Sequence, residues 1–290
     1  MKISRSLTTM LVLGFSASYS FADFTVSNAG PLDSAGAIGT AGNGYFTGTY
    51  SGTSTLFGTI DFSGELTRVI AGTYASEARW NITNLTAGAS TTFQPTTTTS
   101  YTGTINVTKT ASALVWANAG DSFGFESFES YDDGAGADST WNNVSFNFHG
   151  GPSIFNIGNY ASGTDFTIDT ESSTFDTELA LYTSTGTLLG NDDDGGTGTL
   201  SLLTPGVLAD GDYYILAGGY NSTFANGFAF AGNATGNVNV NINGTSVYAG
   251  NHPAGTFDVL EFTVGSPVPE PASFAVLGLG AVALLRRRKK

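Results

Sequence analysis

The chain has 290 residues, 39 of them glycine, and it contains no cysteine, which excludes disulfides, thiolate metal sites and cysteine nucleophiles. Between the two ends, residues 23–265 carry 23 acidic residues against three basic ones (Arg68, Arg79 and Lys109), a formal charge of −20. Such a body has no basic patch for phosphate groups, which argues against binding to nucleic acid. It should attract cations and repel anionic membranes.

The first 22 residues have the three parts of a secretory signal peptide. Lys2 and Arg5 give a positive start, the stretch 7–15 is mostly apolar, and Ala22 is a small residue suited to a cleavage site. The apolar stretch is too short to span a bilayer comfortably. We therefore expect export and cleavage between Ala22 and Asp23.

Residues 23–150 are predicted to form a β-rich domain. Apolar and polar residues alternate in short runs that Gly, Asn, Asp and Thr interrupt, which is typical of strands. In the run 143–148, for example, Val144, Phe146 and Phe148 fall on one face. Strands are expected at 54–62, 78–85, 103–109, 112–117 and 143–148.

A domain boundary is expected within 149–162, which contains Gly151-Pro152. Residues 151–265 are predicted to form a second domain, with strands at 164–169, 177–183, 212–217, 236–242 and 256–264. Several short strands at a spacing of about ten residues indicate a sandwich or a jelly roll. The predicted fold is therefore all-β, with two tandem β-sandwich-like or jelly-roll-like regions.

The most acidic segment is 175–196, FDTELALYTSTGTLLGNDDDGG. Asp176 and Glu178 are two residues apart on an expected strand, so their carboxylates share one face. Three adjacent aspartates then precede two glycines. Calcium takes six to eight oxygen ligands from loops of this kind, although the spacing is not that of an EF-hand. The alternative is a solvated Asp-Gly turn. A second, weaker candidate is the loop Glu129–Gly134, with Asp138 nearby.

The region from about 160 to 220 resembles the bacterial pre-peptidase C-terminal domain. The resemblance lies in FDTELALY (175–182), GNDDDG (190–195) and LADGDYYILA (208–217), with Asp210 as a departure in the last turn. It implies a compact β-sandwich that is not itself catalytic, with calcium beside the acidic loop in some members. The implied candidate ligands are Asp176, Glu178, Asn191, Asp192 and Asp194.

No catalytic constellation stands out in the sequence. His149 precedes two glycines, but no G-x-S-x-G nucleophile motif occurs. His252, in the sequence Gly250-Asn251-His252-Pro253, is expected in an exposed turn. Two isolated histidines provide neither an H-E-x-x-H zinc site nor a defensible Ser-His-Asp arrangement. We therefore predict no catalytic residues.

The C-terminus reads VPEPASFAVLGLGAVALLRRRKK. The run 272–285 is uncharged and mostly apolar, and it is shorter than the ~20 residues of a comfortable membrane span. The basic residues that follow would stay in the cytoplasm by the positive-inside rule. Physical chemistry alone therefore indicates a short, marginal membrane helix at this end, with the body outside.

The same three parts, in the same order, resemble the PEP-CTERM sorting signal of exosortase systems. They are the motif Val268, Pro269, Glu270, Pro271 and Ala272, a short apolar helix, and a basic cluster that includes Arg286, Arg287 and Arg288. The resemblance implies a Gram-negative bacterium that makes exopolysaccharide. It also implies transient recognition by exosortase, cleavage near the motif, and release or attachment at the cell surface. The tail at 266–290 would be the only contact with the membrane, before processing.

These observations predict an exported, non-enzymatic protein of the cell surface or extracellular matrix that is associated with exopolysaccharide or biofilm. One alternative is a calcium-dependent carbohydrate-binding module, which would expose tyrosines or some of Trp80, Trp116 and Trp141 on one face. Another is a secreted hydrolase, which would need convergent catalytic groups in a cleft. Release and attachment of the processed protein both remain open.

Overall fold

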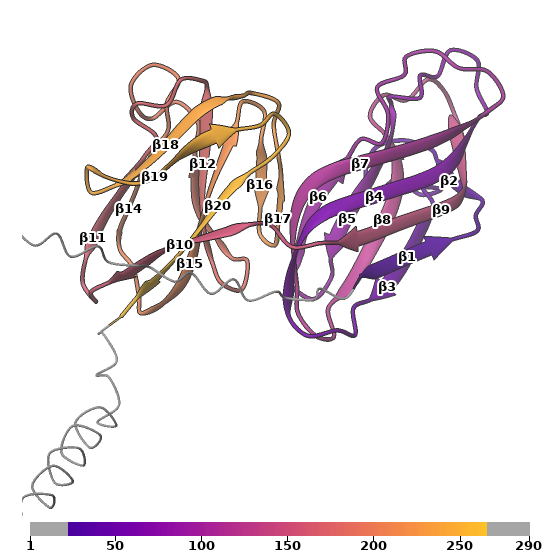
Figure 1. Ribbon diagram of the computed structural model, residues 1–290. Coiled ribbons are helices and arrows are strands. Elements are labelled where there is room, and N and C mark those ends of the chain that lie inside the picture. The colour runs from indigo at the N-terminus through magenta and orange to yellow at the C-terminus, as the bar shows by residue number, and fades with distance from the viewer. Residues whose placement is uncertain (1–22, 266–290) are drawn as a thin grey trace, which may run out of the picture.

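The computed structural model describes residues 23–265; the predicted signal peptide (1–22) and sorting tail with its apolar helix (266–290) lie outside the described residues. The described chain contains twenty strands and no helix, so the all-β prediction is confirmed. The strands form four sheets that pair into two sandwiches placed side by side (Figure 1). Residues 23–265 contain no helix that is long and apolar enough to cross a membrane.

The N-terminal sandwich packs a seven-stranded sheet against a four-stranded sheet. The first has the order β1 (Phe24–Asn28), β9 (Ser139–His149), β4 (Thr55–Arg68), β7 (Thr104–Ala117), β17 (Phe228–Phe230) and β16 (Thr223–Ala225), with β2 (Leu32–Ser34) also on β9. The second has the order β3 (Tyr45–Thr49), β8 (Ser122–Glu129), β5 (Ala78–Asn84) and β6 (Ala89–Phe93).

Large aromatic side chains fill the space between these two sheets. Trp80 and Trp141 are fully buried, with ring centroids 5.8 Å apart. Phe62 packs against both rings, and Phe146 packs against Phe62 and Trp80. The alternation of apolar and polar residues along β9 puts Val144, Phe146 and Phe148 into this core, as the sequence predicts.

The C-terminal sandwich packs a five-stranded sheet against a four-stranded one. The first has the order β10 (Ile154–Tyr160), β20 (Asp258–Val264), β15 (Gly211–Gly219), β12 (Thr177–Thr183) and β13 (Leu188–Asp192). The second has the order β14 (Leu202–Val207), β11 (Asp165–Asp169), β18 (Gly236–Ile242) and β19 (Thr245–His252). All pairings are antiparallel except β10 with β20, which is parallel.

The C-terminal half of the chain also supplies part of the N-terminal sheet. The hairpin of β16 and β17 continues that sheet beyond β7, with Phe228 opposite Val115. The Phe228 side chain is 1% exposed and belongs to the N-terminal core. The sequence predicted no strand at 223–230, because two three-residue strands are too short for an alternating pattern to show.

A third apolar cluster joins the two sandwiches. Trp116 on β7 stacks on Tyr182 of β12, with ring centroids 4.6 Å apart. The Tyr182 hydroxyl donates a hydrogen bond of 2.9 Å to the carbonyl oxygen of Phe228. The strand β12 is therefore buried on both faces, one in its own sandwich and one in this cluster.

We expect Phe228→Ala to destabilise the N-terminal sandwich, although the residue lies far along the chain. Emptying a buried phenylalanine site costs about 3–5 kcal/mol. Denaturant unfolding followed by the fluorescence of the buried tryptophans should show the loss. Phe155→Ala, at a side chain 46% exposed on β10, is the control and should change little. An unchanged transition for Phe228→Ala would contradict the role of the hairpin.

Candidate metal centre

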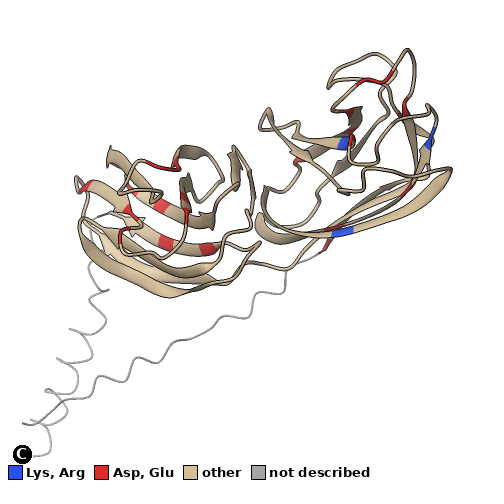
Figure 2. Ribbon diagram, turned by 90° about the horizontal axis from the view of Figure 1, so that it is seen from above, with Lys and Arg blue, Asp and Glu red and all other residues tan. Residues whose placement is uncertain are grey.

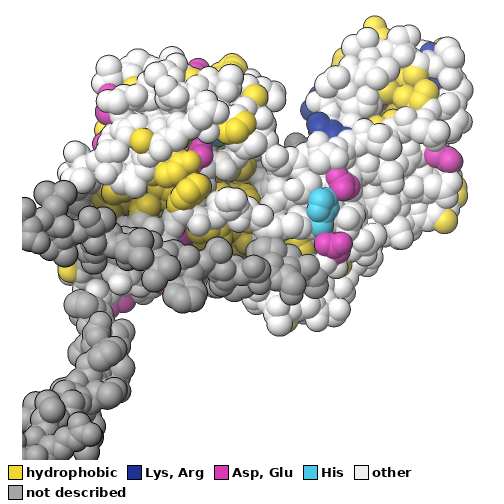
Figure 3. Space-filling view, in the orientation of Figure 1, with side chains coloured by type: hydrophobic (Ala, Val, Ile, Leu, Met, Phe, Trp, Pro, Cys, Tyr) yellow, Lys and Arg dark blue, Asp and Glu magenta, His cyan; other side chains and the backbone are white. Residues whose placement is uncertain are grey.

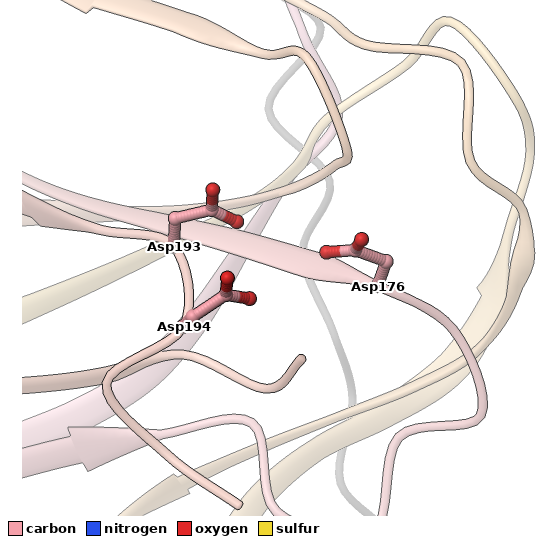
Figure 4. A group of neighbouring side chains, drawn as sticks. All are labelled: Asp176, Asp193 and Asp194. Carbon is pink, nitrogen blue, oxygen red and sulfur yellow. The ribbon is translucent and has the colours of Figure 1, made fainter. Parts of the chain in front are cut away.

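The pairing of two strands in the C-terminal sandwich brings the acidic residues together. Asp176 immediately precedes β12, and Asp193 and Asp194 immediately follow β13. Because β12 and β13 are antiparallel, with Leu179 opposite Asp192, the end of one strand lies beside the start of the other. The three aspartates each offer a carboxylate oxygen, and these oxygens lie within 4.8 Å of one another. Figure 4 shows the three side chains turned toward a common point.

Asp192 organises the acidic loop from within. Its Oδ2 accepts hydrogen bonds of 2.8 Å from the backbone N–H groups of Gly195 and Leu202. A Cβ atom at Gly195 would lie 2.6 Å from the same carboxylate, so a larger residue there would displace the carboxylate from its two donors. At Gly196 a Cβ atom would lie 2.6 Å from the carbonyl oxygen of Leu200. The two glycines after the aspartates therefore allow the loop to close tightly.

Burial and mutual repulsion act on the carboxylates of this site. Burial, reinforced by the charges of Asp193 and Asp194, raises the pKa of Asp176 above its usual value. Burial and the neighbouring Asp194 and Asp192 raise the pKa of Asp193 as well. The Oδ1 atom of Asp176 is withdrawn from water and has no hydrogen-bond partner among the described residues. The cluster thus carries concentrated negative charge that its own hydrogen bonds leave incompletely stabilised.

Glu178 lies beneath this cluster. Its side chain is 7% exposed, and its Oε1 accepts a hydrogen bond of 2.8 Å from the backbone N–H of Asn221. Burial raises the pKa of Glu178 to about 7; the Asn221 hydrogen bond opposes this effect, and the charges of Asp193 and Asp176 add to it. Glu178 is therefore electrostatically coupled to the three aspartates.

No basic side chain compensates for this charge. Residues 151–265 contain twelve acidic residues and neither lysine nor arginine. Figure 2 shows red but no blue along the ribbon of the C-terminal half, and in Figure 3 the dark-blue side chains lie on the N-terminal half. Asp193 and Asp194 are exposed, so the charge of the cluster is left to water, protons and cations from the solution.

The geometry differs in part from the ligand set implied by the sequence. The structure brings Asp176 and Asp194 together and adds Asp193, while Glu178 lies close by. The Asp192 carboxylate instead accepts hydrogen bonds from backbone N–H groups of the loop. Asn191 is exposed on β13 opposite Ala180. Which of the adjacent aspartates turn toward Asp176 depends on the residue at which β13 ends, and the sequence alone does not give that residue. The role of these residues as ligands stays a prediction.

The two histidines occupy separate places. The expectation that His252 lies in an exposed turn is wrong, because it is the last residue of β19 and is fully buried. Its Nδ1 lies 2.6 Å from Oδ2 of Asp258, and its ring stacks on Phe175. His149, at the end of β9, pairs through Nε2 with Asp61 at 2.8 Å. Each histidine is thus held by one aspartate in its own half of the molecule.

Comparison with known proteins identifies the C-terminal tail. Residues 267–289 match the family model of the PEP-CTERM protein-sorting motif. The resemblance seen in the sequence is thereby confirmed, and the motif indicates an exported protein of the cell envelope that is sorted by an exosortase. No curated protein and no solved structure matches the chain. The resemblance to the pre-peptidase C-terminal domain has no support from these comparisons and stays a prediction.

We expect the stability of the metal-free protein to fall as the pH is raised from 5 to 8. A carboxyl group whose pKa is higher in the folded than in the unfolded state binds protons more tightly when folded. The stabilisation from Glu178 is therefore present below about pH 4.5 and is lost as the pH rises toward about 7. A shift of this size corresponds to about 3 kcal/mol.

Thermal unfolding at a series of pH values checks this expectation. Glu178→Gln should reduce the slope of the pH profile, because glutamine does not titrate, while Glu129, whose pKa burial raises to about 8, keeps its own contribution. Glu261→Gln, in the neighbouring strand β20, is the control and should leave the profile unchanged. If Glu178→Gln retains the full pH dependence of the parent, the assignment to Glu178 is wrong.

Proposed function

We propose that this exosortase-sorted protein is a non-enzymatic component of the cell surface or extracellular matrix of a Gram-negative bacterium. In this proposal it associates with exopolysaccharide, and calcium orders its acidic loop. The observation that carries the proposal is the joint presence of the sorting motif at 267–289 and an acidic body whose C-terminal half has no lysine or arginine. A protein of this charge attracts divalent cations, which can also bridge it to anionic polysaccharide.

Calcium suits the carboxylate cluster better than the transition metals do. The three aspartates offer only oxygen atoms, which calcium prefers, and calcium accepts irregular coordination by six to eight oxygens. Nitrogen and sulfur ligands, which favour zinc and copper, are absent from the cluster. The ion would lie between Asp176 on one side and Asp193 and Asp194 on the other, and would thereby tie the 193–200 loop to the start of β12.

A calcium-dependent carbohydrate-binding module is the second candidate. All three tryptophans are buried, so none of them forms an exposed platform for sugar rings. Tyr220, however, is 52% exposed, and its backbone N–H donates to the carbonyl oxygen of Asp176. This places an exposed aromatic residue directly beside the carboxylate cluster. Retention on a neutral polysaccharide that Tyr220→Ala abolishes would favour this candidate.

We expect calcium to raise the melting temperature of residues 23–265, which contain every described strand. A ligand that binds only the folded state at 100 times its Kd adds about 2.7 kcal/mol of stability. The double variant Asp193→Asn/Asp194→Asn, which removes two of the three carboxylates and keeps Asp192 for the loop, should lose most of this increase. Calorimetric melts in calcium and in excess chelator measure the effect.

The matched control is Asp210→Asn/Asp212→Asn. Both residues are exposed and lie in the C-terminal half of the molecule, as Asp193 and Asp194 do. The two double variants remove the same formal charge, so general screening by calcium affects them alike. If the control loses as much of the increase as Asp193→Asn/Asp194→Asn does, calcium acts by screening alone. The aspartates would then form only a solvated turn.

In the native host, we expect the protein to fractionate with exopolysaccharide and to be released from it by a chelator. Glu270→Ala within the sorting motif should block exosortase processing, so that a longer form accumulates in the membrane fraction. Immunoblots of membrane, surface and matrix fractions provide the measurement. A protein that reaches the medium without any retention by the matrix would contradict the association with polysaccharide.

A further inference from the structure

A second acidic cluster lies at one end of the N-terminal sandwich, on different strands from the first. Glu129 is the last residue of β8, and Asp138 immediately precedes β9. The backbone N–H of Glu129 donates to the carbonyl oxygen of Gly36, and that of Asp138 donates to the carbonyl oxygen of Ser34. Both ends of the connection from β8 to β9 are therefore fixed against the segment around β2.

Both acidic side chains are withdrawn from water. Glu129 is 1% exposed and Asp138 is 0% exposed. One oxygen of each carboxylate has a donor: Glu129 Oε1 accepts from the Ser139 hydroxyl at 2.5 Å, and Asp138 Oδ2 accepts from the backbone N–H of Asp133 at 2.8 Å. The other oxygens, Oε2 of Glu129 and Oδ1 of Asp138, have no hydrogen-bond partner among the described residues.

Buried hydroxyl groups without partners occur in the same part of the sandwich. Tyr101 is 6% exposed and its hydroxyl has no partner within the described chain. Burial raises the pKa of Tyr101 above its usual value; the charges of Glu129 and Asp138 raise it further, while Arg68 and Ser139 oppose the rise. The phenol therefore lies near both carboxylates. The hydroxyl of Ser34, opposite Ser139 in the β2–β9 pairing, is also buried and unpartnered.

Protein cations do not neutralise this cluster. Within residues 23–265, no carboxylate forms an ion pair with a lysine or arginine. Arg68 lies over the Tyr101 ring, 6.0 Å from its centroid. A buried charge without a partner is very costly, and native structures rarely leave several buried polar atoms unsatisfied in one place. Burial raises the pKa of Glu129 to about 8, so a proton, a water molecule or a cation is needed among these oxygens.

We propose that a calcium ion occupies this position, bound by the free carboxylate oxygens of Glu129 and Asp138. The neighbouring hydroxyl oxygens and water would complete the shell of six to eight oxygens that calcium takes. This site lies in the other half of the molecule from Asp176, Asp193 and Asp194, and it does not depend on the function proposed above.

Such an ion would hold together connections that no disulfide can link. The carbonyl oxygen of Asp138 accepts from the backbone N–H groups of Val69 and Ile70, so the segment after β4 is already attached to the second cluster. Tyr101 belongs to the long connection between β6 and β7. The ion would thus fix the ends of three connections at one end of the sandwich.

Calorimetric titration of residues 23–265 with calcium chloride tests the proposal. The Asp193→Asn/Asp194→Asn protein, which lacks the first site, should still bind one calcium ion. Adding Glu129→Gln to this background should weaken the remaining binding at least tenfold. The matched control is Glu65→Gln, which should leave calcium binding unchanged. Glu65 lies on β4, and its carboxylate accepts a hydrogen bond from the exposed Asn143 side chain.

Terbium luminescence provides a second measurement that does not require a destabilising variant. Terbium replaces calcium at oxygen sites and is excited through nearby tyrosine or tryptophan. In the Asp193→Asn/Asp194→Asn protein we expect calcium-displaceable emission, with lifetimes in H₂O and D₂O that indicate few bound waters, as burial of Glu129 and Asp138 requires. Lifetimes typical of a fully hydrated ion would overturn the proposal.

The outcomes separate the two calcium sites. If the Asp193→Asn/Asp194→Asn protein binds no calcium, or binds it equally well after Glu129→Gln, the site at Glu129 and Asp138 does not exist and a proton or a water molecule fills its role. If that protein binds as many calcium ions as the parent, the site at Asp176 fails and the second one stands.

Discussion

The stacking of Trp116 on Tyr182 is the contact on which the arrangement of the molecule depends. It buries the outer face of β12 and joins the two sandwiches. Through its hydroxyl, Tyr182 also holds the hairpin that completes the N-terminal sheet. Because β12 is covered on both faces, Glu178 near its start is fixed in place, and Asp176, just before the strand, is held by the hydrogen bond from the Tyr220 backbone N–H to its carbonyl oxygen.

The charge distribution explains why the structure has few ion pairs. With three basic residues in the body, carboxylates are stabilised by backbone N–H groups, hydroxyls and histidines, as at Asp192, Asp121 and Asp258. Where these donors do not suffice, free carboxylate oxygens remain, at Asp176 and at the pair of Glu129 and Asp138. Both places lie where connections meet strand ends. Cations from the environment would act there in place of lysine and arginine, so the protein's rigidity would follow the composition of its surroundings.

Sequence periodicity predicted most of the central strands, because they alternate over many residues or are continuously apolar, but it missed β8, which lies between β3 and β5. The expected strand 177–183 coincides with β12, and 236–242 coincides with β18. The expected strands 103–109 and 112–117 are one strand, β7, since the polar residues between them lie within a ladder with β4. Edge and short strands such as β10 and the β16–β17 hairpin were missed. The partner of β10 is β20 and that of β17 is β7, both far along the chain, and local sequence contains no signal for such pairing.

The place of the β16–β17 hairpin also sets the order in which the molecule can be completed. If the chain emerges N-terminus first, the whole of β1 to β9 precedes the hairpin, and the β7 edge of the sheet has no partner until residues 223–230 arrive. An open strand edge is a site for pairing with other chains, and incomplete folds expose such edges. The hairpin closes this edge shortly before the sorting motif at 267–289 emerges. The order of residues along the chain thus places every strand of the first sheet before the sorting motif.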